Sequence, residues 1–144
     1  YDKFDWEKSK VIPALIRRAI EKHDPFVVWG DGMDLKDFLY IDDCIDGLIL
    51  AMEKLDGFNP INIASGKTVS IRQVLSSILK AADYENAPVE YDSTKPTMIP
   101  KRMIDISLAK QKLGFQPKVS IEEGLKKTIK WYQEYYKSAS PEEF

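Results

Sequence analysis

Cysteine and histidine are the scarcest residues of this 144-residue sequence, with one of each. A single cysteine excludes an internal disulfide, and one cysteine with one histidine offers no ligand cluster at the spacing of a metal site. No apolar run approaches the roughly 20 residues that cross a membrane. The formal net charge of -2 disfavours a nucleic-acid partner, because such proteins usually carry a basic excess. We therefore expect neither membrane nor nucleic-acid binding.

Glycine is sparse too, and it forms none of the loops that cradle phosphates. Gly30-Asp31-Gly32 comes nearest, but it lacks the G-x-G-x-x-G spacing and does not open directly into a helix. No Gly-Lys-Ser/Thr directly follows it. By itself the stretch predicts the turn of a β-hairpin that joins one strand at Phe26–Trp29 to a second at Phe38–Ile41.

The composition is that of an ordinary globular domain, with 44% hydrophobic and 31% charged residues and enough length for a core. The first residue is not methionine, and YDKFDW reads as a loop already in progress, so we expect a piece of a longer protein. The polar opening is not a signal peptide, which together with the lone cysteine predicts a cytoplasmic protein. We expect one domain over residues 1–137 and a frayed tail over 138–144.

Helices alternate with short strands along the chain, which predicts the α/β class. Besides the two strands above, strands are predicted at Pro60–Ile63 and Val89–Tyr91, and a short helix at Ser107–Leu113 is followed by Gly114 as its stop. Longer helices are predicted after Ser9, which could cap the first of them, and at the Ser-x-x-Gln and Ser-x-x-Glu capping boxes that begin at Ser70 and Ser120. The apolar stripe of the helix that begins at Ser70 is predicted to consist of Ile71, Val74, Leu75, Ile78 and Leu79.

One further helix should begin at Asp42 and Asp43, whose charges suit a helix N-terminus. Its predicted buried stripe consists of Cys44, Ile45, Leu48, Ile49 and Met52. The adjacent acids point in different directions on a helix, so they suit capping better than paired acid-base chemistry.

Few residues suggest chemistry by type alone. Lysine and arginine bind phosphate oxygens, but the cations here are scattered, and most scattered cations only solvate a surface: Arg17, Arg18, Lys36, Lys101 and Arg102. Trp29 ends an apolar run beside the turn, where it could either pack or stack on a nucleotide base. His23 is expected at the surface and Cys44 in the core.

Several motifs in order resemble the extended short-chain dehydrogenase/reductases that modify nucleotide sugars. The stretch from Gly30 to Asp43 is similar to the family's Gly-Asp-Gly, Arg-Asp-Phe, strand and Asp-Asp pattern. Asn62–Gly66 with Val69–Ile71 resembles its Asn-Ile-Gly-Ser-Gly and Val-Ser-Ile segment. Its C-terminal signature resembles residues from Arg102 to Leu125. The resemblance covers nearly the whole chain and implies the C-terminal, substrate-binding portion of this fold.

Within the family, residues 9–18 and 27–30 look most like the GDP-fucose synthase branch, where the matching positions surround the nucleotide. The resemblance implies a substrate site made by Lys10, Val11, Leu15, Arg18, Trp29, Lys36 and Arg102. Two positions depart from the pattern. Lys36 stands where arginine is usual and offers a point charge instead of a fork. Lys10 stands where that branch has a histidine that acts as an acid, which leaves the reaction open.

The family implies NAD or NADP bound by an N-terminal Rossmann domain, and catalysis by a Tyr-x-x-x-Lys pair with serine or threonine. Only Tyr91 and Lys95 fit this spacing, and we attribute that match to chance because a proline-containing loop follows the strand. We therefore expect an inactive part of an NAD(P)-dependent epimerase, dehydratase or reductase that binds the diphosphate of a GDP- or UDP-sugar. The missing Rossmann domain would be its partner, and a homodimer is left open. The alternative is a stand-alone, non-catalytic nucleotide-binding or interaction module.

Overall fold

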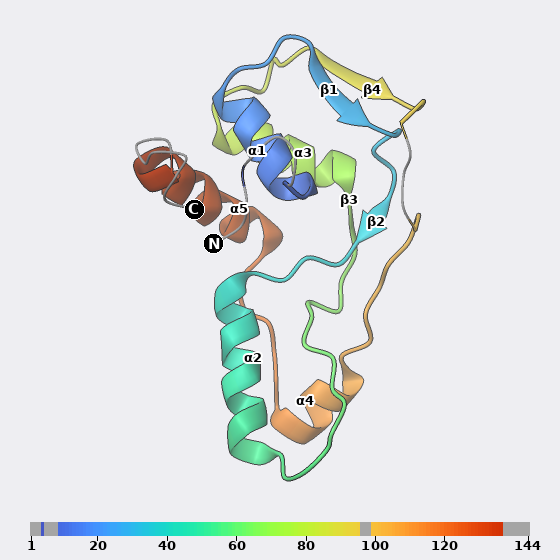
Figure 1. The fold of residues 1–144 in the computed structure, drawn as a ribbon, viewed down its shortest axis with the longest axis vertical. Helices are drawn as coiled ribbons and strands as arrows, with labels where there is room; N and C mark the ends of the chain where they lie inside the picture. Colours follow the sequence, from blue (N-terminus) through green and yellow to red (C-terminus); the bar gives the residue numbers. More distant parts are fainter. Residues whose placement is uncertain (1–3, 5–8, 96–98, 137–144) are drawn as a thin grey trace.

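The computed structural model of the chain describes residue 4, residues 9–95 and residues 99–136 (Figure 1). The predicted tail at 138–144 and most of the opening loop lie outside these residues. The elements are α1 (Val11–Ile20), β1 (Phe26–Trp29), β2 (Leu35–Lys36), α2 (Ile41–Lys54), β3 (Val69–Ser70), α3 (Ile71–Ala81), β4 (Val89–Asp92), α4 (Ser107–Leu113), α5 (Ile121–Trp131) and the π-helical turn η1 (Tyr132–Tyr136). The mixed helix-and-strand class predicted from sequence is confirmed. None of the described helices is both long and apolar enough to span a membrane.

The strands form two small pairs. β1 lies parallel to β4, with Trp29 opposite Asp92, and β2 lies antiparallel to β3, with Leu35 opposite Ser70. The strands on either side of the glycine turn therefore have different partners, so the predicted β-hairpin is wrong. The turn itself is present, because Gly30 and Gly32 have φ angles of 77° and 75°, which glycine adopts without steric cost.

Two predicted strands are also wrong. β2 ends at Lys36, and Ile41 already belongs to α2, so no strand runs from Phe38 to Ile41. Pro60–Ile63 has no strand partner among the described residues. Both segments have a strand-like composition, but a strand also needs a neighbour that supplies its ladder of hydrogen bonds. A local pattern does not contain that information.

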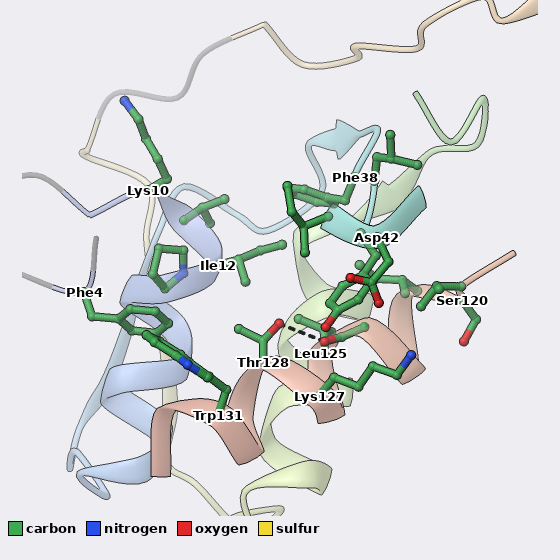
Figure 2. Close-up of a pocket in the computed structure, with 18 residues that line it drawn as sticks. Phe4, Lys10, Ile12, Phe38, Asp42, Ser120, Leu125, Lys127, Thr128 and Trp131 are labelled. Atoms are coloured by element: carbon green, nitrogen blue, oxygen red, sulfur yellow. Dashed lines mark hydrogen bonds between the residues drawn. The ribbon is translucent and has the colours of Figure 1, made fainter. Parts of the chain in front are cut away.

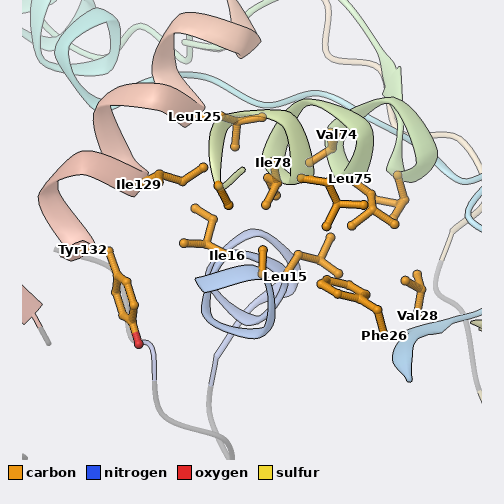
Figure 3. Packing of buried hydrophobic residues seen from close by; sticks show 14 of the residues in the cluster. Leu15, Ile16, Phe26, Val28, Val74, Leu75, Ile78, Leu125, Ile129 and Tyr132 are labelled. Carbon is orange, nitrogen blue, oxygen red and sulfur yellow. The ribbon is translucent and has the colours of Figure 1, made fainter. Parts of the chain in front are cut away.

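The first core cluster joins three helices and the β1–β4 pair (Figure 3). α1, α3 and α5 turn their apolar faces toward one another, and the predicted α3 stripe is confirmed because all of its members are buried. Tyr132 closes the cluster where α5 passes into η1 and stacks on Phe4 with ring centroids 4.5 Å apart. Its buried members are Phe4, Leu15, Ile16, Ala19, Phe26, Val28, Ile71, Val74, Leu75, Ile78, Leu79, Ala82, Leu125, Ile129 and Tyr132.

The second core cluster lies at the other end of the molecule, where α2 and α4 pack together (Figure 1). Its buried members are Ala64, Ile106, Ala109, Leu113 and Phe115. Leu50 and Ala51 of α2 and Leu55 at its C-cap pack against them, as do Ile61 and Ile63. Gly47 permits this approach, because a Cβ there would lie 2.6 Å from Ile63 Cγ2.

The predicted buried stripe of α2 is wrong. Ile45, Leu48, Ile49 and Met52 are exposed, Met52 to 84%, and Cys44 is half-buried. The buried side of α2 is instead the one that carries Gly47, Leu50 and Ala51. Both sides of this helix are apolar, so periodicity identifies a helix but not which side faces the core.

The helix ends show which local signals hold. Ser70 and Gln73 form the predicted reciprocal capping box, and Gly114 ends α4 with a φ of 69°. Ser120 accepts a hydrogen bond from the Glu123 amide, but the Glu123 carboxylate pairs with Lys127 at 3.0 Å, so only half of that box is present. Ser9 does not cap α1, whose N-cap is Lys10.

Asp42 and Asp43 do begin α2, since both lie in its first turn, although the N-cap is Tyr40, whose side chain makes no capping hydrogen bond. Asp43 also makes a contact with a distant part of the chain. Its carboxylate is buried and accepts hydrogen bonds from the amides of Lys118 and Val119, at 3.0 and 2.9 Å. Asp43 thereby ties α2 to the segment that enters α5.

Candidate functional site

The glycine turn after β1 is held rigidly from several sides. Asp31 Oδ1 accepts a hydrogen bond from the Met33 amide, and Arg72 Nε donates to the Asp31 carbonyl at 2.8 Å. Gly32 lies so close to the Tyr91 ring that a Cβ would be 2.6 Å from Cε1. The turn therefore presents Trp29 and β2 in a fixed arrangement.

Trp29 lies at the end of β1 and exposes 56% of its surface. The Lys95 ammonium lies 5.8 Å from the centroid of its indole ring, within the range of a cation–π contact. A large aromatic ring with an exposed face and a nearby cation can hold a planar base that carries negatively charged phosphates.

Lys36 and Arg102 lie next to each other on neighbouring segments. Leu35 and Lys101 form a parallel β-bridge, and the Arg102 amide donates to the Leu35 carbonyl at 2.9 Å. Lys36 and Arg102 each follow one residue of the bridged pair, so side-chain alternation directs them to the same side. The bridge thus places two cationic residues that are far apart in sequence on adjacent backbone segments.

The two cations differ in how they are held. Lys36 Nζ pairs with Asp34 Oδ2 at 3.0 Å and also donates to the carbonyl of Ile99. Arg102 is exposed, and its guanidinium has no hydrogen bond or ion pair with any residue that the structure describes. Lys36 is therefore oriented in advance, whereas the Arg102 fork is available to an external anion.

Leu15 and Arg18 lie in α1, and neither belongs to the group of residues around the turn. Leu15 is 2% exposed and is a member of the first core cluster. Arg18 is half-buried, and its Nη1 donates to the Val27 carbonyl at 2.8 Å. Burial lowers the pKa of the Arg18 guanidinium. Arg18 thereby supports the strand that ends at Trp29, and its predicted contact with a nucleotide stays a prediction.

Lys10 and Val11 lie instead at a cavity of about 880 Å³ between α1, α5 and the segment that leads into α2 (Figure 2). Its apolar lining includes Phe38, Leu125 and Trp131. Trp29, Lys36 and Arg102 do not line it. Five of the seven predicted residues therefore fall into two places: Trp29, Lys36 and Arg102 on the segments around the turn, and Lys10 and Val11 at the cavity. Leu15 and Arg18 belong to neither.

The cavity has a polar edge that sequence reasoning missed. Tyr40 stacks beneath Lys127, whose Nζ lies 5.3 Å from the ring centroid. Burial, followed by the charge of Asp42, raises the pKa of the Tyr40 phenol above its ordinary value. Thr128 also lines the cavity and donates to the Gly124 carbonyl at 2.8 Å.

Two more residues near the turn were missed. Lys95 could not be linked to Trp29 from sequence, because only the parallel pairing of β1 with β4 brings them together. The Asp37 carboxylate accepts hydrogen bonds from the amides of Ser65 and Gly66, both at 2.9 Å. Asp37 directly follows Lys36 in the stretch that resembles the family's Arg-Asp-Phe motif. This position in the motif is the sequence signal that could have identified it.

Comparison with known proteins gives a consistent result. The family model described as GDP-mannose 4,6 dehydratase matches residues 5–128. A probable GDP-L-fucose synthase from rice (Oryza sativa subsp. japonica) is 38% identical over 142 residues, which cover 96% of this chain and 43% of that protein.

Two crystal structures show the same fold. One is a UDP-glucose 4-epimerase from Thermotoga maritima with UDP-glucose, with a TM-score of 0.82 and 30% identity over 94% of this chain and 44% of the other. The second is a UDP-glucuronic acid 4-epimerase from Bacillus cereus in complex with NAD, with a TM-score of 0.75 and 28% identity over 92% and 40%. The chain thus spans less than half the length of each relative.

Proposed function

Since the chain belongs to the GDP-mannose 4,6-dehydratase family of extended short-chain dehydrogenase/reductases, we propose that it is the substrate-binding part of a nucleotide-sugar epimerase, dehydratase or reductase. Its relatives act on GDP- or UDP-sugars as much longer proteins. The share of their length that this chain spans supports the proposal that further residues complete the enzyme. On its own, the chain is expected to be inactive.

One observation carries the proposal: an unengaged arginine beside a fixed lysine. A nucleotide diphosphate presents several anionic oxygens, and an arginine fork can bind two of them at once. Lys36, already oriented by Asp34, adds a point charge on the same side. The exposed Trp29 ring supplies a face on which the base could stack. These three residues form the proposed nucleotide wall.

The dinucleotide cofactor of the family does not fit the described residues. Its phosphates bind where a glycine-rich turn opens a helix, but Gly30–Gly32 leads into β2, which pairs with β3. The Tyr91–Lys95 pair is not a catalytic pair either, because Arg72 lies 4.4 Å over the Tyr91 ring while Lys95 faces Trp29. We therefore assign NAD or NADP, and the proton-transferring residues, to the part of the enzyme outside this chain.

The test is a titration of GDP-sugars and UDP-sugars into the longer protein that contains this chain. Arg102→Ala should weaken binding about tenfold or more, since a hydrogen bond to a charged group contributes about 1.5–3 kcal/mol. Lys36→Ala should cost less, because the lysine is already neutralised in part by Asp34. Lys101→Ala is the matched control and should bind normally, because Lys101 alternates away from Arg102.

Two outcomes would count against the proposal. If wild type and Arg102→Ala bound the nucleotide sugar equally well, the nucleotide would not bind at the proposed nucleotide wall. Unimpaired nucleotide-sugar binding by the 144-residue chain alone would favour the stand-alone, non-catalytic module over a part of an enzyme.

A further inference from the structure

Asp34 forms an ion pair with Lys36, the fixed cation of the nucleotide wall. Its Oδ2 atom lies 3.0 Å from Lys36 Nζ, and the side chains of Asp34 and Lys36 expose only 18% and 20% of their surface. Ion pairs shielded to this extent are screened less by salt than pairs on an open surface. The Asp34 carboxylate therefore acts on any anion that binds Lys36, and not only on the lysine.

The contacts of the lysine limit how far such an anion can lie from Asp34. An ammonium has three N–H donors, and Lys36 directs one to Asp34 and one to the Ile99 carbonyl. No other partner of this ammonium is present among the residues that the structure describes, so the third donor remains for a phosphate oxygen. A charged N–H binds such an oxygen at about 2.8 Å. Because Nζ and Oδ2 are 3.0 Å apart, that oxygen would lie within about 6 Å of the Asp34 carboxylate.

Asp34 is the acid that changes the charge of the nucleotide wall. Lys36 and Arg102 are two cations, and the Asp34 carboxylate reduces their combined charge from two to one. The neighbouring acid Asp37 is engaged elsewhere, since its carboxylate accepts hydrogen bonds from the amides of residues 65 and 66. The wall thus attracts phosphate with less positive charge than its cations alone would supply.

This lower charge matters because two related ligands differ in their own charge. In a nucleotide sugar each phosphate is esterified on both sides and carries a single negative charge. The terminal phosphate of a free nucleoside diphosphate ionises a second time, with a pKa of about 6, and so carries nearly one more charge at neutral pH. A nearby carboxylate opposes every negative charge of the ligand, so it disfavours the free nucleotide more than the nucleotide sugar.

We infer that Asp34 is a specificity-determining residue of the nucleotide wall. Its carboxylate offsets the charge of Lys36 and makes the site favour the diphosphate diester of a nucleotide sugar over a free nucleoside diphosphate. This inference rests on the proposed function, because it takes Lys36 and Arg102 as the cations that bind phosphate. It adds the ligand charge that the site selects, and an acid that the family motif does not single out.

The test is Asp34→Asn in the longer protein that contains this chain. The asparagine carbonyl can still accept the hydrogen bond from Lys36, so the charge is removed while the lysine keeps its partner. The backbone contact of this residue, whose carbonyl accepts from the Ile71 amide at 3.1 Å, does not involve the side chain. Calorimetry at low ionic strength measures the affinity for GDP and a GDP-sugar, or for UDP and a UDP-sugar, according to which pair wild type binds.

Both ligands should bind Asp34→Asn more tightly than wild type, and the free nucleotide should gain by the larger factor. One unit charge at about 6 Å changes binding about threefold even at the dielectric constant of water. The nucleotide sugar should therefore gain about threefold or more. The free nucleoside diphosphate should gain about a further twofold or more, because its additional charge is no longer opposed.

Asp46→Asn is the matched control. Asp46 belongs to another aspartate–lysine pair, with Lys118 Nζ at 3.3 Å, and lies on α2, outside the nucleotide wall. This variant loses the same charge, so both affinities should remain those of wild type. A gain as large as that of Asp34→Asn would assign the preference to the net charge of the protein and would overturn the inference.

The same substitution in a Lys36→Ala background separates charge from orientation. Asp34→Asn should still favour the free nucleotide there, because the carboxylate acts on phosphate without the lysine. Weaker or unchanged binding by Asp34→Asn, an equal gain for both ligands, or a gain that disappears with Lys36→Ala would contradict the role of Asp34. The two proposals fail separately. Unimpaired binding by Arg102→Ala contradicts the nucleotide wall itself, whereas weakened binding by Arg102→Ala with no gain from Asp34→Asn contradicts only this inference.

Discussion

The first core cluster is enclosed by α1, α3 and α5, whereas the second has α4 and segment 60–63 against one side of α2, and no described element covers the other side (Figure 1). In the first, apolar residues of each helix face the helices around it. In the second, the outer side of α2 exposes residues as apolar as those inside. The difference teaches that apolar residues do not by themselves decide burial, because the outer side of α2 stays exposed although it is as apolar as a core face.

The largest contrast should appear when one isoleucine is removed from each region. Ile78 of α3 is fully buried, so Ile78→Ala should cost about 2–5 kcal/mol in free energy of unfolding, measured by urea denaturation of the chain. Ile45 on the outer side of α2 is 47% exposed, so Ile45→Ala should cost less than about 1 kcal/mol. Similar costs for the two variants would mean that α2 is already covered in the chain.

The same two substitutions, Ile78→Ala and Ile45→Ala, should also be measured in the longer protein. If residues outside this chain cover the outer side of α2, the cost of Ile45→Ala should rise there toward that of Ile78→Ala. The cost of Ile78→Ala should stay the same, since its surroundings are already complete.

A smaller effect is expected at the link between the two regions. Asp43→Ala would leave the amides of Lys118 and Val119 without their acceptor and should cost about 1–3 kcal/mol in urea unfolding. Asp42→Ala is the neighbouring control: its side chain is exposed, and its loss should cost less than about 0.5 kcal/mol. If the two aspartates proved equivalent, the tie between α2 and the entry to α5 would not stabilise the chain.

Sequence reasoning succeeded where the signal and its cause are both local. The α3 capping box and buried stripe were predicted correctly, because the cap lies within three residues and the helix has a single apolar side. The stripe of α2 was assigned to the wrong side, because both of its sides are apolar and the choice depends on a partner surface. Segment 60–63 was predicted wrongly for the same reason: its composition is that of a strand, but it has no strand partner among the residues that the structure describes.

The candidate site shows the same limit of local sequence signals. The residue types of Trp29, Lys36 and Arg102 could be chosen from sequence by resemblance, but their grouping could not. Lys36 and Arg102 lie on adjacent segments only because Leu35 bridges to Lys101 across nearly half the chain. Leu15 was assigned to the pocket from the same resemblance, and its position in the first core cluster could be known only once α1, α3 and α5 were packed.

The smallest expected effect lies at α4, within the second region. Hydrogen bonds from Ser107, first from its hydroxyl and then from its amide, lower the pKa of the Asp105 carboxyl. A carboxyl whose pKa is lower in the folded state stabilises that state above its unfolded pKa and loses this contribution as pH falls through the folded pKa. Asp105→Ala should therefore lower the urea midpoint at neutral pH, by less than Asp43→Ala, and this gap should close in acid. The gap should also shrink in a Ser107→Ala background, because the hydroxyl that favours the ionised carboxyl is then gone. A gap that persists unchanged in acid would show that the ionised carboxyl is not what stabilises the start of α4.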